Sequence, residues 1–414
     1  MKERNIITLL LLIVSVITAC NGPVTDDAGS DGMVRKAAEI HKKVLTLDSH
    51  CDSPLWLLHP GFDITMRHDP YKDHSRVDFP RMKEGGLDAS FFAVFLSQGN
   101  RNEEGNAAAR KSAEDIFALI HTAGEVSPDA CVAYEPEDAY TLEKEGKCAI
   151  FIGMENGYPI GQDISLVQHF YNLGARYITL CHTLNNDICD SSTDTLEYGG
   201  LSDFGREVVK EMNRIGMMID VSHISDSSFY DVIEISKAPV IASHSCTRAL
   251  CNHPRNLDDK MLVKLAENGG VIQICLVNEY IKELPPNPQR DSAMNALHEK
   301  YSNFEALSEE QKDSARNEWF AIQVEYPEEL AGVSDLVDHI DHAVKVAGID
   351  HVGIGTDFDG GAGIDGCFDV SEMGNITLEL VRRGYTEEEI AKIWAGNFMR
   401  VFREVRRCSE IITK

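Results

Sequence analysis

The feature that most constrains the fold of this chain is a series of eight short apolar runs, separated by longer segments with helical character. Each run is apolar at nearly every position, which is typical of strands that are buried on both faces. Strands that alternate with helices indicate parallel βαβ units, and eight such units predict an α/β fold of the (β/α)8 TIM-barrel type. The runs occupy residues 44–47, 89–96, 149–154, 177–181, 217–221, 240–243, 270–277 and 352–355.

One connection in this series is much longer than the others. Residues 278–351 separate the seventh run from the eighth, and the part 278–326 is polar, rich in proline near its start and helical in character around 304–319. Long connections in compact domains are usually functional or disordered. We therefore predict an insertion between strands seven and eight of the barrel, and two interpretations stay open: a lid over the barrel mouth or a solvated excursion.

The N-terminal segment indicates export. Residues 1–19 combine a short charged start with an apolar stretch too short to cross a bilayer with ease, as in a signal peptide. The residues 17–20 resemble a bacterial lipobox, which predicts cleavage before Cys20 and lipidation of its sulfur. An ordinary signal peptide with an incidental Cys20 is the alternative. We expect a flexible tether over 20–35, a barrel domain over 36–414 and an exported lipoprotein anchored to the cell envelope, at the periplasmic or outer surface.

The charge of the chain argues against several kinds of partner. The formal net charge is −28, whereas binding to nucleic acid requires basic patches. The same charge argues against an electrostatic attachment to anionic lipid, so the N-terminal lipid is the only membrane contact we expect. Ten cysteines follow Cys20, and those inside apolar runs, Cys148, Cys181 and Cys275, are expected to be buried free thiols.

Histidines and carboxylates follow most of the apolar runs. In a (β/α)8 barrel the carboxyl ends of the strands converge on one active site, so residues that are distant in sequence are expected to meet there. The residues in question are His50, Asp52, Glu155, His182, His223, His244 and Asp357.

Five of these residues are compatible with a two-metal site, although any one of them alone could be structural. His50 and Asp52 stand two apart, and alternate residues of a strand point the same way, so they can bind one cation together. His223 and His244 offer neutral imidazoles, which suit zinc. No lysine stands at a strand end, so bridging two ions would fall to Glu155. Two such ions can deprotonate a shared water, which predicts hydrolysis by a metal-bridging hydroxide.

His182 and Asp357 are candidate catalytic groups beside these metals. A histidine there can donate to the oxyanion that develops during attack, and an aspartate can move the proton from the water to the leaving amine. The alternative for Asp357 is a structural loop carboxylate, a role for which Asp359 is the better candidate. The sequence contains no Gly-x-Ser-x-Gly elbow and no Walker loop, which disfavours covalent serine and phosphate chemistry.

Taken together, these stretches resemble the renal (membrane) dipeptidase family, a branch of the amidohydrolase-like barrel hydrolases. The resemblance runs from about Val44 to Phe402, which is nearly the whole expected mature chain. The motifs that carry it lie at residues 48–52, 78–86, 153–157, 174–182, 201–206, 220–223, 243–245, 255–256, 351–360 and 396–398.

The resemblance implies two zinc ions in each subunit. One would be held by His50, Asp52 and Glu155, and the other by Glu155, His223 and His244. Dipeptides are the substrates that the family takes, and it tolerates a D-residue at the second position. Family members are commonly dimeric, so a homodimer is also expected.

The resemblance also assigns three roles around the metals. It implies that His182 steadies the tetrahedral intermediate, that Asp357 handles the proton, and that Arg255 binds the C-terminal carboxylate of the substrate. A guanidinium can grip a carboxylate through two parallel hydrogen bonds, so Arg255 would limit the substrate to two residues. The alternatives are a related binuclear-metal hydrolase of N-acyl amino acids and a non-catalytic surface lipoprotein that binds a ligand. The complete set of metal ligands argues against the latter.

Overall fold

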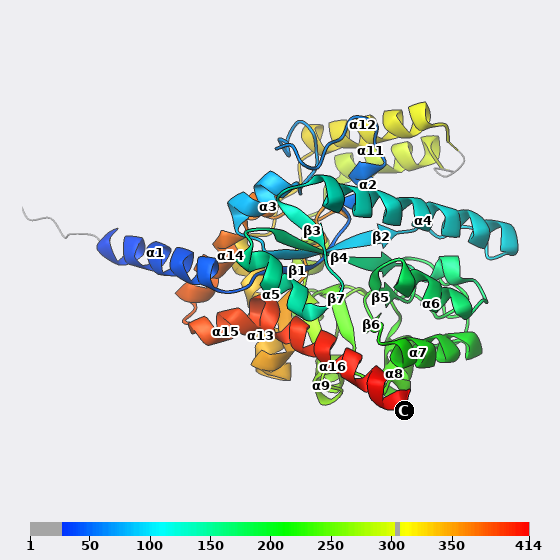
Figure 1. The fold of residues 1–414 in the computed structure, drawn as a ribbon. Coiled ribbons are helices and arrows are strands. Elements are labelled where there is room, and N and C mark those ends of the chain that lie inside the picture. Colours follow the sequence, from blue (N-terminus) through cyan, green and yellow to red (C-terminus); the bar gives the residue numbers. More distant parts are fainter. Residues whose placement is uncertain (1–26, 303–306, 414) are drawn as a thin grey trace, which may run out of the picture.

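A parallel β-sheet forms the centre of the computed structural model, which describes residues 27–302 and 307–413 (Figure 1). In these residues the strands follow the order β1-β2-β4-β5-β6-β7-β8-β9, and β3 pairs separately with β4. The strands are β1 Leu47–Cys51, β2 Ala89–Phe95, β3 Ala130–Val132, β4 Cys148–Glu155, β5 Ala175–Thr179, β6 Met218–Asp220, β7 Ile241–Ser245, β8 Val271–Ile274 and β9 Val352–Ile354.

Backbone hydrogen bonds join the first strand to the segment after the last one. The N–H of Asp357 donates to the carbonyl of His50 over 2.9 Å, and the N–H of Asp52 donates to the carbonyl of Phe358 over 2.8 Å. The sheet therefore forms a nearly closed barrel of eight parallel strands flanked by helices, as predicted. The short strand β3 was not predicted.

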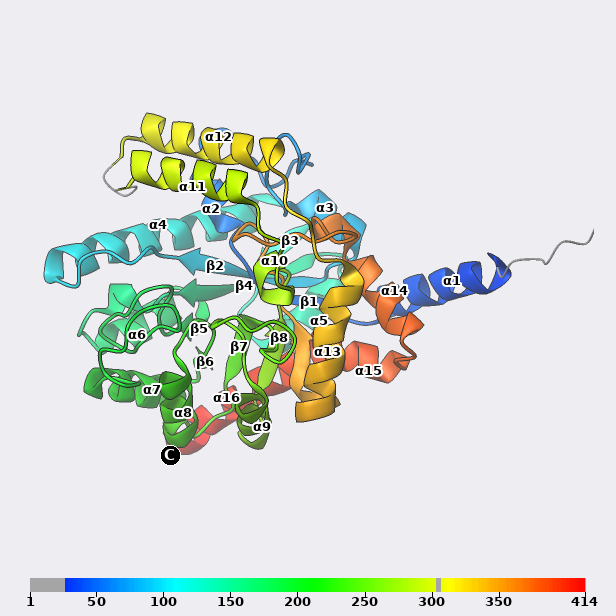
Figure 2. The same cartoon turned by 180° about the vertical axis from the view of Figure 1, so that it is seen from behind.

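Helices surround this barrel in both views (Figures 1 and 2). They are α1 Asp27–Lys43, α2 Pro54–Leu57, α3 Phe79–Gly85, α4 Glu103–Val126, α5 Pro136–Lys144, α6 Ser165–Asn172, α7 Asp203–Ile215, α8 Asp226–Ile235, α9 Asp259–Glu267, α10 Asn278–Ile281, α11 Pro288–Lys300, α12 Glu309–Glu325, α13 Val333–Ala347, α14 Gly374–Arg382, α15 Glu387–Ala391 and α16 Asn397–Ile412. None of the described helices is both long and apolar enough to cross a membrane.

Helix α1 changes the expectation for the N-terminal region. It begins at Asp27, so residues 27–35 are helical and are not part of a flexible tether. The helix projects from the barrel in Figure 1, and its second half, in which Ala37 and Ile40 are buried, packs on α14. Burial of this apolar face stabilises a helix that the polar composition of 20–35 did not indicate. The predicted signal peptide and Cys20 lie outside the described residues.

The insertion between β8 and β9 is mainly a helical hairpin. Figures 1 and 2 show α11 and α12 side by side next to α2. The ring of Phe320 on α12 stacks on His74 in the loop after β1, with ring centroids 3.5 Å apart. The hairpin is therefore anchored to a loop that follows a strand of the barrel, and it is not an unattached excursion.

The end of the barrel opposite the carboxyl ends of the strands is filled by aromatic side chains. Phe91 of β2 and Phe151 of β4 stack with ring centroids 4.9 Å apart. Helix α16 adds Phe398, 5.0 Å from the Phe91 ring, and Phe402, 5.9 Å from the Phe151 ring. These buried rings form an apolar base, and the polar residues singled out by the sequence lie at the other end of the strands.

Candidate active site

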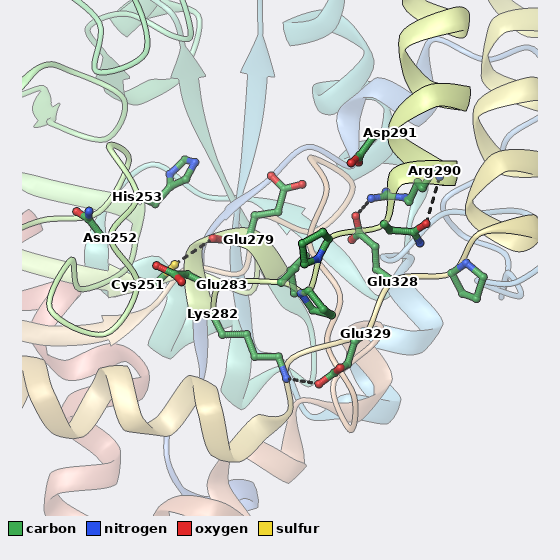
Figure 3. A pocket seen from close by; sticks show the side chains of 15 residues that line it. Cys251, Asn252, His253, Glu279, Lys282, Glu283, Arg290, Asp291, Glu328 and Glu329 are labelled. Atoms are coloured by element: carbon green, nitrogen blue, oxygen red, sulfur yellow. Dashed lines mark hydrogen bonds and ion pairs between the residues drawn. The ribbon is translucent and has the colours of Figure 1, made fainter.

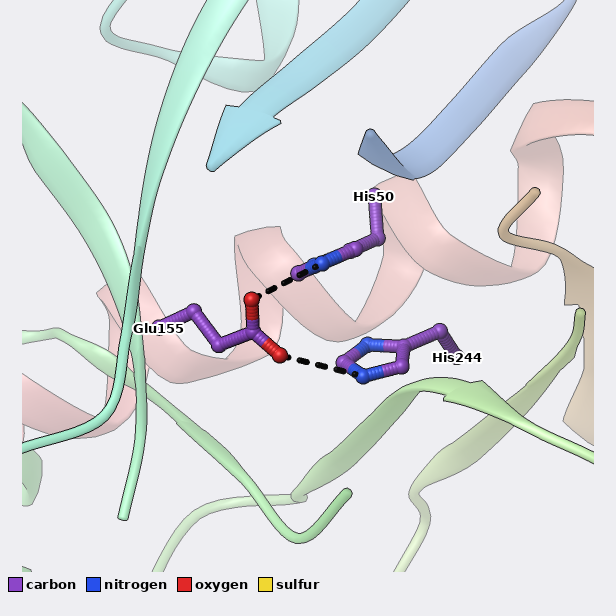
Figure 4. A group of neighbouring side chains, drawn as sticks. All are labelled: His50, Glu155 and His244. Atoms are coloured by element: carbon purple, nitrogen blue, oxygen red, sulfur yellow. Dashed lines mark ion pairs between the residues drawn. The ribbon is translucent and has the colours of Figure 1, made fainter. Parts of the chain in front are cut away.

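The carboxyl ends of the strands bring the predicted metal ligands into one buried cluster, part of which is shown in Figure 4. His50 lies in β1, Glu155 ends β4, and His244 lies in β7. His223 follows β6, and Asp52 follows β1. The fold thus brings these five residues together.

Glu155 lies between two groups of ligands. Its Oε2 is 3.4 Å from Nε2 of His50, whereas its Oε1 is 3.0 Å from Nε2 of His223 and 3.4 Å from Nε2 of His244. Figure 4 shows the carboxylate directed between the imidazoles of His50 and His244. Each oxygen therefore faces a different set of donors, as a bridging carboxylate requires.

Unpaired polar atoms in this cluster fit a metal site. Nε2 of His50, Oδ1 of Asp52 and Oε2 of Glu155 are buried and have no hydrogen-bond partner. Such atoms are costly to bury unless something binds them, and imidazole and carboxylate donors suit zinc. Three sets of residues each offer ligand atoms that lie within 4.8 Å of one another. These sets are His50, Glu155 and His244; Glu155, His182 and His223; and His50, Asp52 and Asp357.

The electrostatics of the cluster keep three of its ligands in the forms that bind metal. Burial and the charge of His50 lower the pKa of His244 to about 3, so this imidazole is neutral. Burial and the charge of Arg255 likewise hold the pKa of His223 well below its usual value. Burial alone would raise the pKa of Glu155, but His50 and the other imidazoles hold it well below the usual range. Glu155 is therefore a carboxylate.

Asp357 lies on the same side of the cluster as Asp52. Its Oδ1 is 3.9 Å from Nε2 of His50. Burial and the charge of Asp52 raise the pKa of Asp357 well above its usual value, which is a property expected of a group that carries a proton. A Cβ on Gly360 would lie 2.2 Å from Oδ2 of Asp52 and 2.3 Å from Oδ1 of Asp357, so only glycine lets this loop approach.

Asp359, by contrast, has the structural role predicted for it. Its carboxylate accepts hydrogen bonds from Oγ of Ser53 over 2.6 Å and from Nε1 of Trp56 over 3.1 Å. It also accepts from the backbone N–H of Arg76 over 2.6 Å. Asp359 therefore ties the loops after β1 and β9 together beside the cluster.

His182 stands at the solvent side of the cluster. Its Nε2 is 3.8 Å from Oε1 of Glu155, and its ring centroid is 4.3 Å from that of His223. Burial lowers the pKa of His182. Because 22% of its side chain is exposed, it can face a substrate that enters from solvent.

Arg255 reaches the cluster from the loop after β7. Its Nη2 donates to the carbonyl of His244 over 3.0 Å, and its buried Nε has no partner. The guanidinium lies over the ring of Tyr280, 5.4 Å from the centroid. Tyr280 is a site residue that the sequence did not reveal, because it lies in the polar insertion. The sequence did contain a signal for Tyr280. It stands only a few residues beyond the seventh apolar run, and residues that follow the strands of the barrel lie near the active site.

The backbone is strained around the same residues. In the described chain five non-glycine residues have positive φ, and four of them follow strand ends: Asn156, His223, Asp357 and Asp359. Such conformations persist where the surrounding structure holds them, and they cluster at functional sites.

A cavity lies beside the insertion (Figure 3), and none of the candidate metal ligands lines it. Its volume is about 530 Å³, and it lies between the loop after β7 and residues 279–291. His253 lines the cavity and packs on Tyr280 with ring centroids 4.5 Å apart. The cavity is therefore next to the tyrosine that covers Arg255.

Comparison with known proteins agrees with this geometry. The family model described as membrane dipeptidase (peptidase family M19) matches residues 34–414. Dipeptidase tcpJ of Claviceps purpurea is 32% identical over 352 residues, which are 83% of this chain and 73% of that protein. The crystal structure of the probable dipeptidase PvdM from Pseudomonas aeruginosa is 32% identical, with a TM-score of 0.78, and the match covers 91% of this chain and 99% of that one.

A more distant structure shows the same fold. It is a metallo peptidase from Rhodobacter sphaeroides, liganded with a phosphinate mimic of the dipeptide L-Ala-D-Ala, with 21% identity and a TM-score of 0.70. The match covers 87% of this chain and 99% of that one. The chain therefore belongs to the membrane dipeptidase family, peptidase family M19, and is a metal-dependent dipeptidase.

Proposed function

We propose that this dipeptidase holds two zinc ions and cleaves dipeptides, including those with a C-terminal D-residue. The observation that carries the two-metal assignment is the position of Glu155, whose two oxygens face separate sets of ligands. His50 and Asp52 would hold one ion together with Glu155. His223 and His244 would hold the other, again with Glu155.

The protein residues around the ions would bind and orient the substrate. When bound, the two zinc ions would supply Lewis-acid chemistry, which activates a water molecule and polarises the scissile carbonyl. Arg255 binds the C-terminal carboxylate, His182 donates to the developing oxyanion, and Asp357 takes a proton at its carboxylate and delivers it to the leaving amine. The raised pKa of Asp357 supports this last role.

Two observations support a dipeptide as substrate. Arg255 is buried at the edge of the cluster with an unpaired Nε, so a charged group is available for a carboxylate at a fixed distance from the metal ligands. The related Rhodobacter sphaeroides enzyme binds a mimic of L-Ala-D-Ala, which supports tolerance of a D-residue.

The N-terminal sequence supports a location at the cell envelope. We infer that residues 1–19 are removed and that the lipid on Cys20 anchors the enzyme. Helix α1 projects from the barrel in Figure 1, which suits a connection to a membrane. Metabolic labelling with a radioactive fatty acid tests this inference: wild-type protein should take up label, and a Cys20→Ala variant should not. Label in both would contradict lipidation at Cys20.

An assay of the purified enzyme tests the proposed activity. The substrates are L-L dipeptides, L-D dipeptides and N-acyl amino acids, each measured with and without a chelator. We expect turnover of both dipeptide classes, loss on chelation and recovery with zinc. Faster turnover of N-acyl amino acids than of any dipeptide would favour the related amide hydrolase.

A further inference from the structure

The three imidazoles proposed as metal ligands differ in what their second ring nitrogen contacts. Nδ1 of His50 lies 2.7 Å from the hydroxyl of Tyr177, and Nδ1 of His244 lies 2.8 Å from Oγ of Ser243. Nδ1 of His223 is buried and has no hydrogen-bond partner. Two of the three rings are thus held by a hydroxyl group.

Tyr177 reaches His50 across the inside of the barrel. It lies in β5 opposite Gly153 of β4, and a Cβ on Gly153 would be 2.0 Å from Cζ of the tyrosine ring. The ring therefore occupies space that any side chain at position 153 would fill. It also stacks on Phe91 of the aromatic base, with centroids 5.3 Å apart. Tyr177 is completely buried and has little room to move.

The second contact of each hydroxyl fixes the direction of its hydrogen bond to histidine. The Tyr177 hydroxyl lies 3.3 Å from the carbonyl of Ser49, which can only accept, so the tyrosine donates there and accepts from Nδ1–H of His50. This leaves Nε2 of His50 to face Glu155. In the same way the Ser243 hydroxyl donates to Oδ2 of Asp220 over 2.6 Å and accepts from Nδ1–H of His244.

Asp220 is itself held by several donors. Its Oδ1 accepts from the backbone N–H of Ser222 over 3.0 Å and of Ser243 over 2.9 Å, and its Oδ2 also accepts from Oγ1 of Thr179 over 2.5 Å. A carboxylate fixed in this way leaves the Ser243 hydroxyl little choice of direction. Partners of this kind orient metal-binding histidines and raise their affinity for the metal.

We propose that Tyr177 and Ser243 are positioning residues, each of which prepares one metal ion's histidine. Tyr177 presents Nε2 of His50 to the ion shared with Asp52, and Ser243, supported by Asp220, presents Nε2 of His244 to the other ion. This inference rests on the proposed two-metal function. It predicts that the two metal sites can be weakened separately.

The test measures the zinc affinity of each site in the full enzyme. Metal-free protein is titrated with zinc against a competing chelator, and anomalous diffraction from crystals equilibrated at limiting zinc shows which site is filled. Tyr177→Phe should weaken the site of His50 by about 10- to 100-fold and leave the other nearly unchanged. Ser243→Ala should weaken the site of His244 by a similar factor and spare the site of His50.

Matched variants separate positioning from packing. Tyr385→Phe removes a tyrosine hydroxyl that donates to Asp341, and Ser409→Ala removes a serine hydroxyl that donates to the carbonyl of Arg406 on α16, both away from the cluster. Neither should change either zinc affinity. Gly153→Ala, which displaces the ring of Tyr177, should reproduce the selective loss at the site of His50 if Tyr177→Phe proves too unstable to titrate.

The results distinguish failure of this inference from failure of the proposed function. Selective losses at opposite sites support it. Unchanged affinities in both variants, or equal weakening of both sites in each variant, would overturn it. Wild-type enzyme that binds a single zinc ion would instead overturn the two-metal function, and the effect of Tyr177→Phe on His50 would still report whether that hydrogen bond positions a ligand.

Discussion

The two ends of the barrel contain opposite kinds of residue, although the same strands pass through both. At the base, Phe91 and Phe151 stack with Phe398 and Phe402 of α16 in an apolar layer. At the mouth, histidines and carboxylates are just as deeply buried, and several of their atoms have no hydrogen-bond partner. The base therefore stabilises the fold, whereas the buried polar groups at the mouth lower the stability until metal ions bind them.

The backbone shows the same contrast. Positive φ occurs at His223 and Asp357, among other residues that follow strand ends at the mouth. Local strain and unpaired polar atoms at the same place indicate that the mouth is arranged for chemistry. Changes at the mouth should therefore abolish activity with little loss of stability, and changes at the base should do the reverse.

The largest effect on activity is expected for Glu155→Gln at the mouth. The amide cannot offer a negatively charged oxygen to each ion. Loss of a single oxyanion-hole donor costs an enzyme up to about 10³-fold, and loss of the metal bridge should lower kcat/KM by more than this. Metal content by mass spectrometry and dipeptide turnover check this. Glu114→Gln, which changes a half-exposed partner of His169, is the control. Retention of two metals and normal turnover in Glu155→Gln would refute the bridge.

The next largest effect is expected for Arg255→Ala. Loss of one partner of a buried charge pair costs about 2–5 kcal/mol, which is roughly 30- to 5000-fold in kcat/KM. Most of the loss should appear as a higher KM, because the residue binds substrate. Arg214→Ala, which breaks a surface ion pair with Glu211, should change neither constant. An unchanged KM for dipeptides in Arg255→Ala would contradict the proposal that Arg255 binds the substrate carboxylate.

At the base, Phe402→Ala should lower the free energy of unfolding by about 3–5 kcal/mol, because it leaves a cavity in the aromatic layer. The folded enzyme should keep kcat within about twofold, since its active-site geometry is supported by the strands themselves. Denaturant unfolding and turnover below the transition measure both quantities. A folded variant with little activity would show that the two ends are not independent.

A smaller and graded effect is expected from pH. Burial lowers the pKa of His50, but the oxygens of Tyr177 and Glu155 raise it well above the usual value, so zinc must displace a proton from this ring. Burial and the charge of Glu155 raise the pKa of Asp52 to about 6, so a second proton must leave below that pH. As the pH is lowered, zinc affinity should thus fall about tenfold for each pH unit, and more steeply below about pH 6.

Titration of metal-free protein between pH 5 and 8 checks this dependence. His244, whose pKa is about 3, stays neutral throughout this range and should not contribute to the pH dependence of zinc affinity. An affinity that is independent of pH across this range would contradict the protonation states assigned to His50 and Asp52.

Much of this site followed from the sequence because barrels convert sequence order into spatial position. Each ligand stands where an apolar run stops, and the carboxyl ends of parallel strands meet. Thus His50 and Glu155 were assigned to one site without knowledge of any distance. The first strand was nevertheless placed too early, at 44–47 instead of Leu47–Cys51, because the buried Asp48, Ser49 and His50 interrupt its apolar pattern.

What the sequence did not reveal are the contacts that depend on side-chain direction. Tyr177 counted only as an apolar strand residue, since nothing in its neighbourhood shows that its hydroxyl crosses the barrel to His50. Tyr280 was hidden in an insertion defined by its polar composition. The start of helix α1 was missed because it lies in the polar stretch 20–35, whereas the buried residues of the helix, Ala37 and Ile40, come after that stretch.

The central claim is that two metal ions at the mouth of the barrel carry out dipeptide hydrolysis. The most direct test is to remove all metal from the purified enzyme and to follow dipeptide turnover as zinc is added back in measured equivalents. We predict no turnover without metal and a maximum at two equivalents of zinc per chain. Full turnover by protein whose metal content has been shown to be negligible would contradict the claim.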